Sequence, residues 1–204
     1  MNEILRHIWS GLTEASPLDQ ANLVLGIVGV WLMIRRNLWA FPVGLIAVSV
    51  QGVLFFKTRF YADATLQLFF FGALAWGWWH WLQGRAASAE LPVNRLRSVG
   101  WLVTLAVSGA ATLMWALALR RWTDAVMPWR DAFIAAFSVA GQVLQSRKTL
   151  ENWPVWIVVN GVAVVSYWRA DLAYTAFLYA VYLAMAVIGW RQWTKALRSR
   201  AAGA

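Results

Sequence analysis

An internal repeat runs through most of this chain. Residues 19–81 align without a gap with residues 131–193, at a constant offset of 112 positions, and 14 of the 63 aligned positions are identical. The identities include residue types that rarely match by chance in an apolar sequence. They are Asp19 with Asp131, Arg35 with Arg147, Pro42 with Pro154, and Gly77-Trp78 with Gly189-Trp190. A repeat of this length constrains the fold before any other feature, because both copies should form the same structural unit.

Each copy of the repeat contains three long apolar runs. A helix that spans a membrane needs about 20 predominantly apolar residues, with a range of about 17–25. Seven runs of the chain lack Asp, Glu, Lys and Arg: residues 20–34, 37–56, 64–84, 98–119, 132–146, 152–168 and 172–190. The first and fifth runs have only 15 residues, but they are repeat equivalents, and flanking arginines can extend such helices into the interface. The sequence therefore predicts seven transmembrane helices.

The order of these runs predicts an all-α integral membrane fold. Three helices bring the chain to the opposite side of the membrane, so a single linker helix must return it before the second triplet starts. The two triplets are then parallel repeats related by an axis along the membrane normal, in a three-plus-one-plus-three arrangement. The predicted units are an N-terminal tail (1–19), a first repeat (20–84), a linker region (85–130) with its helix at 98–119, a second repeat (131–193) and a basic C-terminal tail (194–204).

Composition supports membrane insertion and excludes several classes of function. The chain is 61% hydrophobic and 13% charged, against about 45–50% and about 25% in soluble domains. Its net charge of +9 would suggest nucleic acid in a soluble protein, but the basic residues form short clusters between apolar runs and indicate membrane topology instead. The chain has no Cys, so disulfides and Cys-based metal sites are excluded. We expect no nucleic-acid partner, no cofactor and no cleaved signal peptide.

The loops carry unequal numbers of Lys and Arg. Seven lie on the side that holds the N-terminus, and eleven lie on the other side, among them Arg35, Arg85, Lys148 and Arg198. Cytoplasmic loops are enriched in basic residues. We therefore predict that the N-terminus lies outside the cell and that the C-terminus lies on the cytoplasmic side of the membrane.

Few residues in the apolar runs could carry chemistry. None of the seven runs contains a charged residue, and Asp63 stands just before the third. The sequence shows no paired carboxylates at depth, no nucleophile with a general base and no cluster of metal ligands, and His7 and His80 are isolated near helix ends. The chain is therefore not predicted to be an enzyme. Coupling to protons or sodium in membrane proteins commonly uses an intramembrane carboxylate, and none of the seven runs contains one.

Neutral polar and aromatic side chains form stripes on several of the predicted helices. An unpaired amide in lipid costs several kcal/mol, so such side chains should face protein or water. One interpretation is hydrogen bonding between helices. The other is an aromatic-walled site that holds a flat cationic ring by stacking and cation–π attraction. The candidate binding residues are Gln51, Gln67, Gln142, Trp156, Asn160, Tyr167, Tyr179 and Tyr182.

Three segments resemble the PnuC family of bacterial vitamin transporters. They are YADATLQLFFFGALAWGWWHW at 61–81, ENWPVWIVVNG at 151–161 and LAYTAFLYAVYLAMAVIGWRQW at 172–193. The resemblance covers about residues 37–193 and is looser toward the N-terminus. It implies a fold similar to the SWEET sugar transporters, a homotrimer in the bacterial inner membrane, and facilitated diffusion of nicotinamide riboside for NAD biosynthesis.

The resemblance also implies a midplane site containing Gln67, Gln142, Trp156, Asn160, Tyr167 and Tyr179. Thiamine, a flat-ringed monocation like nicotinamide riboside, is the alternative substrate, and a non-transporting accessory membrane subunit is the alternative from another class.

Overall fold

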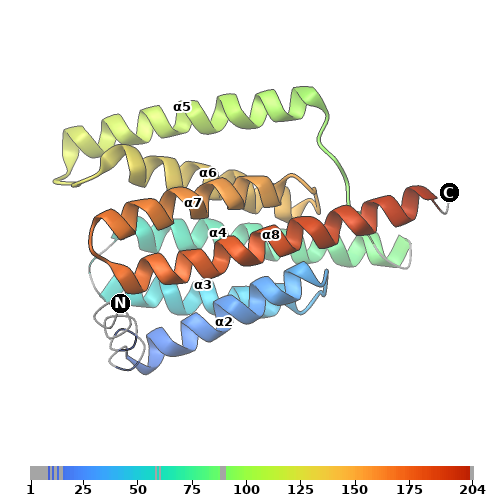
Figure 1. Ribbon diagram of the computed structural model, residues 1–204, viewed down its shortest axis with the longest axis horizontal. Helices are drawn as coiled ribbons and strands as arrows, with labels where there is room; N and C mark the ends of the chain where they lie inside the picture. The colour runs from blue at the N-terminus through green and yellow to red at the C-terminus, as the bar shows by residue number, and fades with distance from the viewer. Residues whose placement is uncertain are drawn as a thin grey trace.

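The computed structural model describes residues 9, 11, 13, 16–57, 59, 61–87 and 91–202. This part of the chain forms seven long helices that lie side by side (Figure 1). They are α2 (Pro17–Ile34), α3 (Ala40–Lys57), α4 (Tyr61–Ala87), α5 (Ser98–Trp122), α6 (Pro128–Ser146), α7 (Asn152–Arg169) and α8 (Ala173–Ala202). The only β-type pairing in the described ranges is an isolated bridge between Asn94 and Thr149. The predicted all-α class with seven helices is confirmed.

Several helices run beyond the uncharged runs that predicted them. α2 begins at Pro17 because Ser16 caps it, its hydroxyl accepting a hydrogen bond from the Asp19 amide at 3.2 Å. At the other end of the chain, α8 continues to Ala202, so residues 194–202 of the predicted basic tail are helical. A charged residue ends an apolar run but not a helix, since Lys and Arg are good helix formers. The division of the chain into domains remains a prediction.

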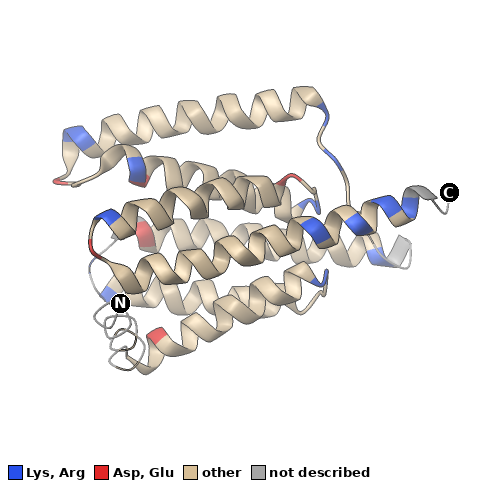
Figure 2. Cartoon of the chain, viewed as in Figure 1, with Lys and Arg blue, Asp and Glu red and all other residues tan. Residues whose placement is uncertain are grey.

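Charged residues lie toward the two ends of the bundle and leave its middle uncharged (Figure 2). Four helices, α2, α3, α5 and α8, are long and apolar enough to cross a membrane by their own composition. α4, α6 and α7 are not among these four, and α6 buries a face of small and polar side chains that includes Ser138, Gln142 and Ser146. A helix that packs against other helices needs less apolar surface than one surrounded by lipid. We refer below to the end at which α2, α4, α6 and α8 finish as the basic end.

The backbone reproduces the internal repeat. Among the described residues, four that are not glycine have positive φ angles: Arg36 (56°), Lys148 (54°), Arg59 (63°) and Asp171 (56°). These are two pairs at the repeat offset of 112. Arg36 and Lys148 each end a helix in the left-handed conformation that commonly terminates helices. Their amides donate to Met33 and Gln145, which are again equivalent positions. The two triplets therefore share their turns as well as their helices.

The two triplets hold each other at the basic end through reciprocal contacts. α4 packs on α6, and α8 packs on α2. The Trp81 indole donates to the Ser146 carbonyl at 3.0 Å, and the equivalent Trp193 indole donates to the Ile34 carbonyl at 3.2 Å. Each indole therefore satisfies a carbonyl at the end of the first helix of the other triplet, where helix carbonyls lack partners within the helix.

The linker region breaks this symmetry. α5 packs along α6, at the edge of the bundle (Figure 1). Before α5, the Asn94 amide donates to the Lys148 carbonyl at 3.0 Å and the Asn94 carbonyl accepts from the Leu150 amide at 2.9 Å. Arg95 adds an ion pair to Glu151 at 3.5 Å. The linker is thus attached to the second triplet, so the two copies of the repeat have different surroundings.

Candidate functional site

A cavity of about 320 Å³ lies between the two triplets. Most of its wall comes from α6, α7 and α8, and the first triplet contributes one side of α2 and one residue of α4. The lining residues are Gly26, Val30, Met33, Phe70, Ile134, Ser138, Gln142, Gln145, Trp153, Trp156, Val159, Asn160, Tyr179, Tyr182 and Ala186. The lining is aromatic and neutral, because it contains no Asp, Glu, Lys, Arg or His. Such a wall suits a small organic molecule with a flat ring better than an inorganic ion.

Helix α7 supplies the central wall through Trp156 and Asn160, which lie one turn apart on the same face. The Trp156 indole donates to the Gln145 side-chain oxygen at 3.0 Å. The absence of a side chain at Gly141 lets this indole lie against α6, since a Cβ there would come within 3.1 Å of the ring. Trp156 is thereby fixed in orientation by both a hydrogen bond and packing.

Asn160 is 6% exposed, and its carboxamide makes no hydrogen bond to any of the residues that the structure describes. A buried amide without a partner costs about 1–3 kcal/mol, and this one lines the cavity, where a ligand or water can reach it. Its two donors and its acceptor are therefore available to a bound molecule.

The predicted residues Gln142, Tyr179 and Tyr182 also line the cavity. The amide of Gln142 donates weakly to the Ser146 hydroxyl at 3.4 Å. The Tyr182 hydroxyl approaches the backbone of Gly26 so closely that a Cβ at this glycine would overlap it. Together with Trp156 and Asn160, five of the eight predicted residues come together at one cavity. Their role in binding remains a prediction.

The other three predicted residues lie outside the cavity. Tyr167 stacks on Tyr179 with ring centroids 5.3 Å apart and 17° between the ring planes. Gln51 accepts a hydrogen bond from the Asn22 side chain, so in this conformation it joins two helices. Gln67 lines a separate groove between α3 and α4. The structure does not bring Gln51 or Gln67 to the cavity wall, and their part in binding also remains a prediction.

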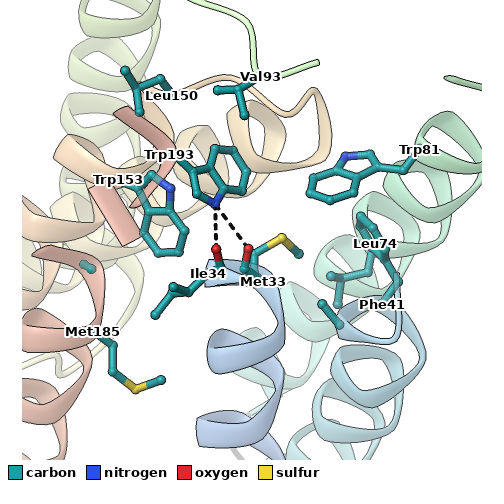
Figure 3. Packing of buried hydrophobic residues seen from close by; sticks show 12 residues of the cluster. Met33, Ile34, Phe41, Leu74, Trp81, Val93, Leu150, Trp153, Met185 and Trp193 are labelled. Atoms are coloured by element: carbon teal, nitrogen blue, oxygen red, sulfur yellow. Dashed lines mark hydrogen bonds between the residues drawn. The ribbon is translucent and has the colours of Figure 1, made fainter. Parts of the chain in front are cut away.

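Aromatic side chains close the cavity toward the basic end (Figure 3). Trp153 and Met33 line the cavity. Trp193 meets Trp153 edge to face, with centroids 5.4 Å apart, and lies 6.0 Å from Trp81 on its other side. All of these side chains are at most 2% exposed. Because these side chains are buried and pack against one another, a bound molecule would leave at this end only if the layer rearranged.

A second set of aromatic contacts lies behind the cavity wall, toward the opposite end. The Arg130 guanidinium lies over the Tyr167 ring, 5.3 Å from its centroid, and Tyr167 in turn covers Tyr179 of the cavity wall. Arg130 is fixed by an ion pair to Asp131 at 2.8 Å. Two layers on either side of one cavity are the arrangement expected of a site that is reached from each side in turn.

Sequence reasoning missed two polar residues of the wall, Ser138 and Gln145. Both lie on α6 with Gln142, at spacings of four and three residues, which places all three on one helical face. This polar stripe was present in the sequence. Gly26 and Met33 carry no such signal, since their place on the wall follows only from how α2 packs. Among the described residues no group of three or more His, Cys, Asp or Glu could hold a metal ion.

Comparison with known proteins identifies the chain's family. The profile of a family described as nicotinamide mononucleotide transporter matches residues 16–195. The chain belongs to this transporter family. The predicted resemblance is thereby confirmed. The chain is a multi-pass membrane protein of a bacterial transporter family. Membership of a transporter family also confirms the prediction that the chain is not an enzyme.

Individual relatives of this transporter cover nearly its whole length. It is 26% identical over 227 residues to the nicotinamide riboside transporter PnuC of Escherichia coli, across 98% of this chain and 95% of that protein. It is 28% identical over 186 residues to the riboflavin/roseoflavin transporter RibM of Streptomyces davaonensis, across 89% of this chain and 85% of that one. The crystal structure of the vitamin B3 transporter PnuC superposes with a TM-score of 0.75 at 22% identity, covering 96% of this chain and 90% of the other. This last likeness establishes the fold.

Proposed function

We propose that this transporter carries nicotinamide riboside into the bacterial cell by facilitated diffusion with alternating access. The cavity between the triplets is the binding site, and the layers toward the two ends open in turn. Transporter families of this kind place the substrate site near the middle of the membrane, between repeats. The nicotinamide riboside transporter PnuC of Escherichia coli, which aligns with 98% of this chain, supports this choice of substrate.

The observation that carries the proposal is the unpaired carboxamide of Asn160 on the cavity wall. A residue that served only to join helices would be bonded to another helix, as Gln51 is bonded to Asn22. Asn160 instead keeps its donors and its acceptor for the cavity, and a pair of ribose hydroxyls matches both functions. Trp156, one turn away, offers its ring to the pyridinium by stacking and cation–π attraction, worth roughly 0.5–2 kcal/mol.

The volume of the cavity favours a small substrate. Ligand sites in proteins range over about 300–1,000 Å³, and about 320 Å³ lies at the lower end. One heterocycle with a ribose suits this volume better than the three fused rings of a flavin. Riboflavin nevertheless is the second candidate, because a relative that covers 89% of the chain transports it. Thiamine, which is also a flat-ringed monocation, is the third.

The neutral wall supports transport without ion coupling. The lining contains no carboxylate that could carry a proton or bind sodium. We propose that the basic end faces the cytoplasm, in keeping with the excess of Lys and Arg there, and that the protein assembles as a homotrimer. Uptake that exceeds the external concentration only under an imposed proton or sodium gradient would refute passive transport.

The test is to measure ligand affinity and melting temperature on the same purified Asn160→Ala variant. We expect nicotinamide riboside binding, followed by intrinsic Trp fluorescence, to weaken by about 1–3 kcal/mol, with little change in the melting temperature without ligand. The matched control is Asn22→Ala, whose carboxamide is bonded within the protein. This control should lower the melting temperature and preserve affinity. Unchanged affinity of Asn160→Ala would remove Asn160 from the site.

Parallel titrations decide the substrate. Nicotinamide riboside, thiamine and riboflavin are added separately to the same wild-type preparation, and uptake of each is then measured in proteoliposomes. The proposal expects the tightest saturable binding and the fastest uptake for nicotinamide riboside. A preference for riboflavin would reassign the substrate within the family, and the absence of saturable binding and uptake for all three would favour an accessory subunit.

A further inference from the structure

A second pocket lies at the basic end, on the other side of the tryptophan layer from the transport cavity. Its volume is about 300 Å³, and it is lined by Arg35, Arg36, Asn37, Leu38, Trp81, Arg85, Leu91 and Lys148. Four of these eight residues are cationic and none is acidic. They come from three separate parts of the chain: the α2–α3 turn, the end of α4 and the α6–α7 turn. The two triplets thus build the pocket together.

The charges around this pocket act on a small, half-open concavity. Lys148 is 1% exposed, and its ammonium lies 4.3 Å from the centroid of the Trp81 ring, which forms part of the wall. Cations gathered around a concavity with low-dielectric walls focus the field and raise the local concentration of anions. Arg36 and Lys148 also interact within the protein, so an anion would be attracted by the summed charge of the lining and not by any one unpaired group.

We propose that this pocket binds a phosphate-bearing anion. Guanidinium groups match phosphate oxygens with paired hydrogen bonds, and an ammonium adds a point charge. The pocket offers three guanidinium groups and one ammonium group, while Leu38, Leu91 and Trp81 supply apolar surface for the rest of the phosphate-bearing molecule. Basic pockets between helix ends at the membrane surface commonly hold lipid headgroups, and a soluble phosphate ester has the same recognition chemistry.

The bound anion would also connect the two triplets. Arg35 and Arg85 belong to the first triplet, whereas Lys148 belongs to the second and rests on Trp81, the residue whose indole caps Ser146 across the interface. An anion that holds these groups together therefore stabilises the arrangement in which the basic end is closed. This inference does not depend on which vitamin the transport cavity binds, because the two pockets share no lining residue.

The test uses the full-length protein and two probes that separate the sources of phosphate. In detergent, inorganic pyrophosphate is titrated by calorimetry at constant ionic strength. In the second arm, the melting temperature is compared between vesicles of phosphatidylcholine alone and vesicles that also contain phosphatidylglycerol. Saturable pyrophosphate binding indicates a soluble phosphate ester, and stabilisation only by phosphatidylglycerol indicates a lipid headgroup; either supports the site.

The decisive variant is the double substitution Arg35→Gln with Arg85→Gln. Both residues are exposed, so the variant should fold. We expect pyrophosphate affinity to fall by about tenfold or more, equal to about 1.4 kcal/mol, or the stabilisation by phosphatidylglycerol to be lost. The matched control is Arg121→Gln with Arg147→Gln, which removes the same charge from exposed positions that do not line the pocket.

Three results would overturn the proposal. The first is that the wild-type protein neither binds pyrophosphate nor is stabilised by phosphatidylglycerol. The second is that the control double variant loses as much pyrophosphate affinity or lipid stabilisation as the pocket variant. The third is that the pocket variant responds to both probes as the wild type does. In each case the four cations serve only to balance the negative ends of the helices that finish there. Binding of nicotinamide riboside, measured on the same preparations, reports separately on the transport site and should be unchanged in both double variants.

Discussion

In the first repeat, Gly44 of α3 faces Leu74 of α4, whereas the equivalent positions of the second repeat hold Trp156 and Ala186. Leu74 is 6% exposed, and a Cβ at Gly44 would come within 3.3 Å of its methyl group. Trp156 and Ala186 instead line the transport cavity. One backbone framework therefore carries opposite distributions of side-chain volume, with the bulky residue on the third helix in one copy and on the second helix in the other.

The copies also differ in polarity at the positions that line the cavity in the second repeat. Val30, Met33 and Val48 of the first repeat correspond to Gln142, Gln145 and Asn160 of the second. Near the basic end, by contrast, Trp81 and Trp193 are identical and make equivalent hydrogen bonds. The symmetric part holds the two triplets together, and under the proposed function the asymmetric part would supply different groups to the two sides of an asymmetric ligand.

The largest expected effect comes from replacing Leu74 of the first repeat by alanine, the residue at the equivalent position of the second repeat, Ala186. Leu74→Ala leaves a void beside Gly44, and removing a buried leucine side chain costs about 2–5 kcal/mol in the free energy of unfolding. Thermal unfolding in detergent measures the loss, and ligand affinity should be preserved because Leu74 does not line the cavity. Leu68→Ala, at a 73% exposed position of the same helix, is the control. An equal loss in both variants would contradict the proposed filling role of Leu74.

The next effect tests a part that the two copies share. A Cβ at Gly189 would lie 2.6 Å from the Trp153 ring, and a Cβ at the equivalent Gly77 would lie 2.8 Å from Phe41 and from the Ser146 hydroxyl. We expect Gly189→Ala and Gly77→Ala each to destabilise the protein by about 1–3 kcal/mol, the usual cost of overpacking. Gly72 of α4 has no such neighbour within 4 Å. Gly72→Ala should therefore be neutral or slightly stabilising, since alanine is the better helix former. A loss at Gly72 as large as at Gly189 and Gly77 would show that close contact at those two glycines is not the cause of the destabilisation.

The sequence predicted the symmetric part of the molecule more completely than the asymmetric part. The offset of 112 positions predicted the two three-helix triplets, and helical spacing placed Trp156 and Asn160 on one face of their helix. Gln67 and Tyr179 are repeat equivalents, and the sequence made both of them candidate binding residues. In this structure Tyr179 lines the cavity, whereas Gln67 lines a separate groove between α3 and α4. Which copy holds the cavity depends on packing between helices that are distant in sequence, and periodicity within one helix carries no information about that.

A smaller effect concerns a hydroxyl present in only one copy. The Ser146 hydroxyl donates to the Ala73 carbonyl of α4 at 2.9 Å, whereas the equivalent residue of α2 is Ile34. Ser146→Ala should lower the free energy of unfolding by about 0.5–1.5 kcal/mol, the net contribution of one hydrogen bond. Thermal unfolding measures this loss. The control is Ser49→Ala, whose exposed hydroxyl bonds only within its own helix; a loss in the control as large as in Ser146→Ala would show that the contact between the triplets contributes nothing.

The smallest expected effect distinguishes Gln67 from its counterpart Tyr179. Gln67 lies in the groove beside Gly52, where a Cβ at this glycine would sit 3.4 Å from its side chain. Gln67→Leu should therefore change nicotinamide riboside affinity by no more than about 0.5 kcal/mol, as substitutions away from a site commonly do. Tyr179→Leu should weaken binding clearly, since it removes a stacking ring from the cavity wall. Fluorescence titration of both variants measures the difference. If Gln67→Leu weakens binding as much as Tyr179→Leu, another conformation of the transport cycle brings Gln67 to the substrate, and the two repeats contribute to binding in turn.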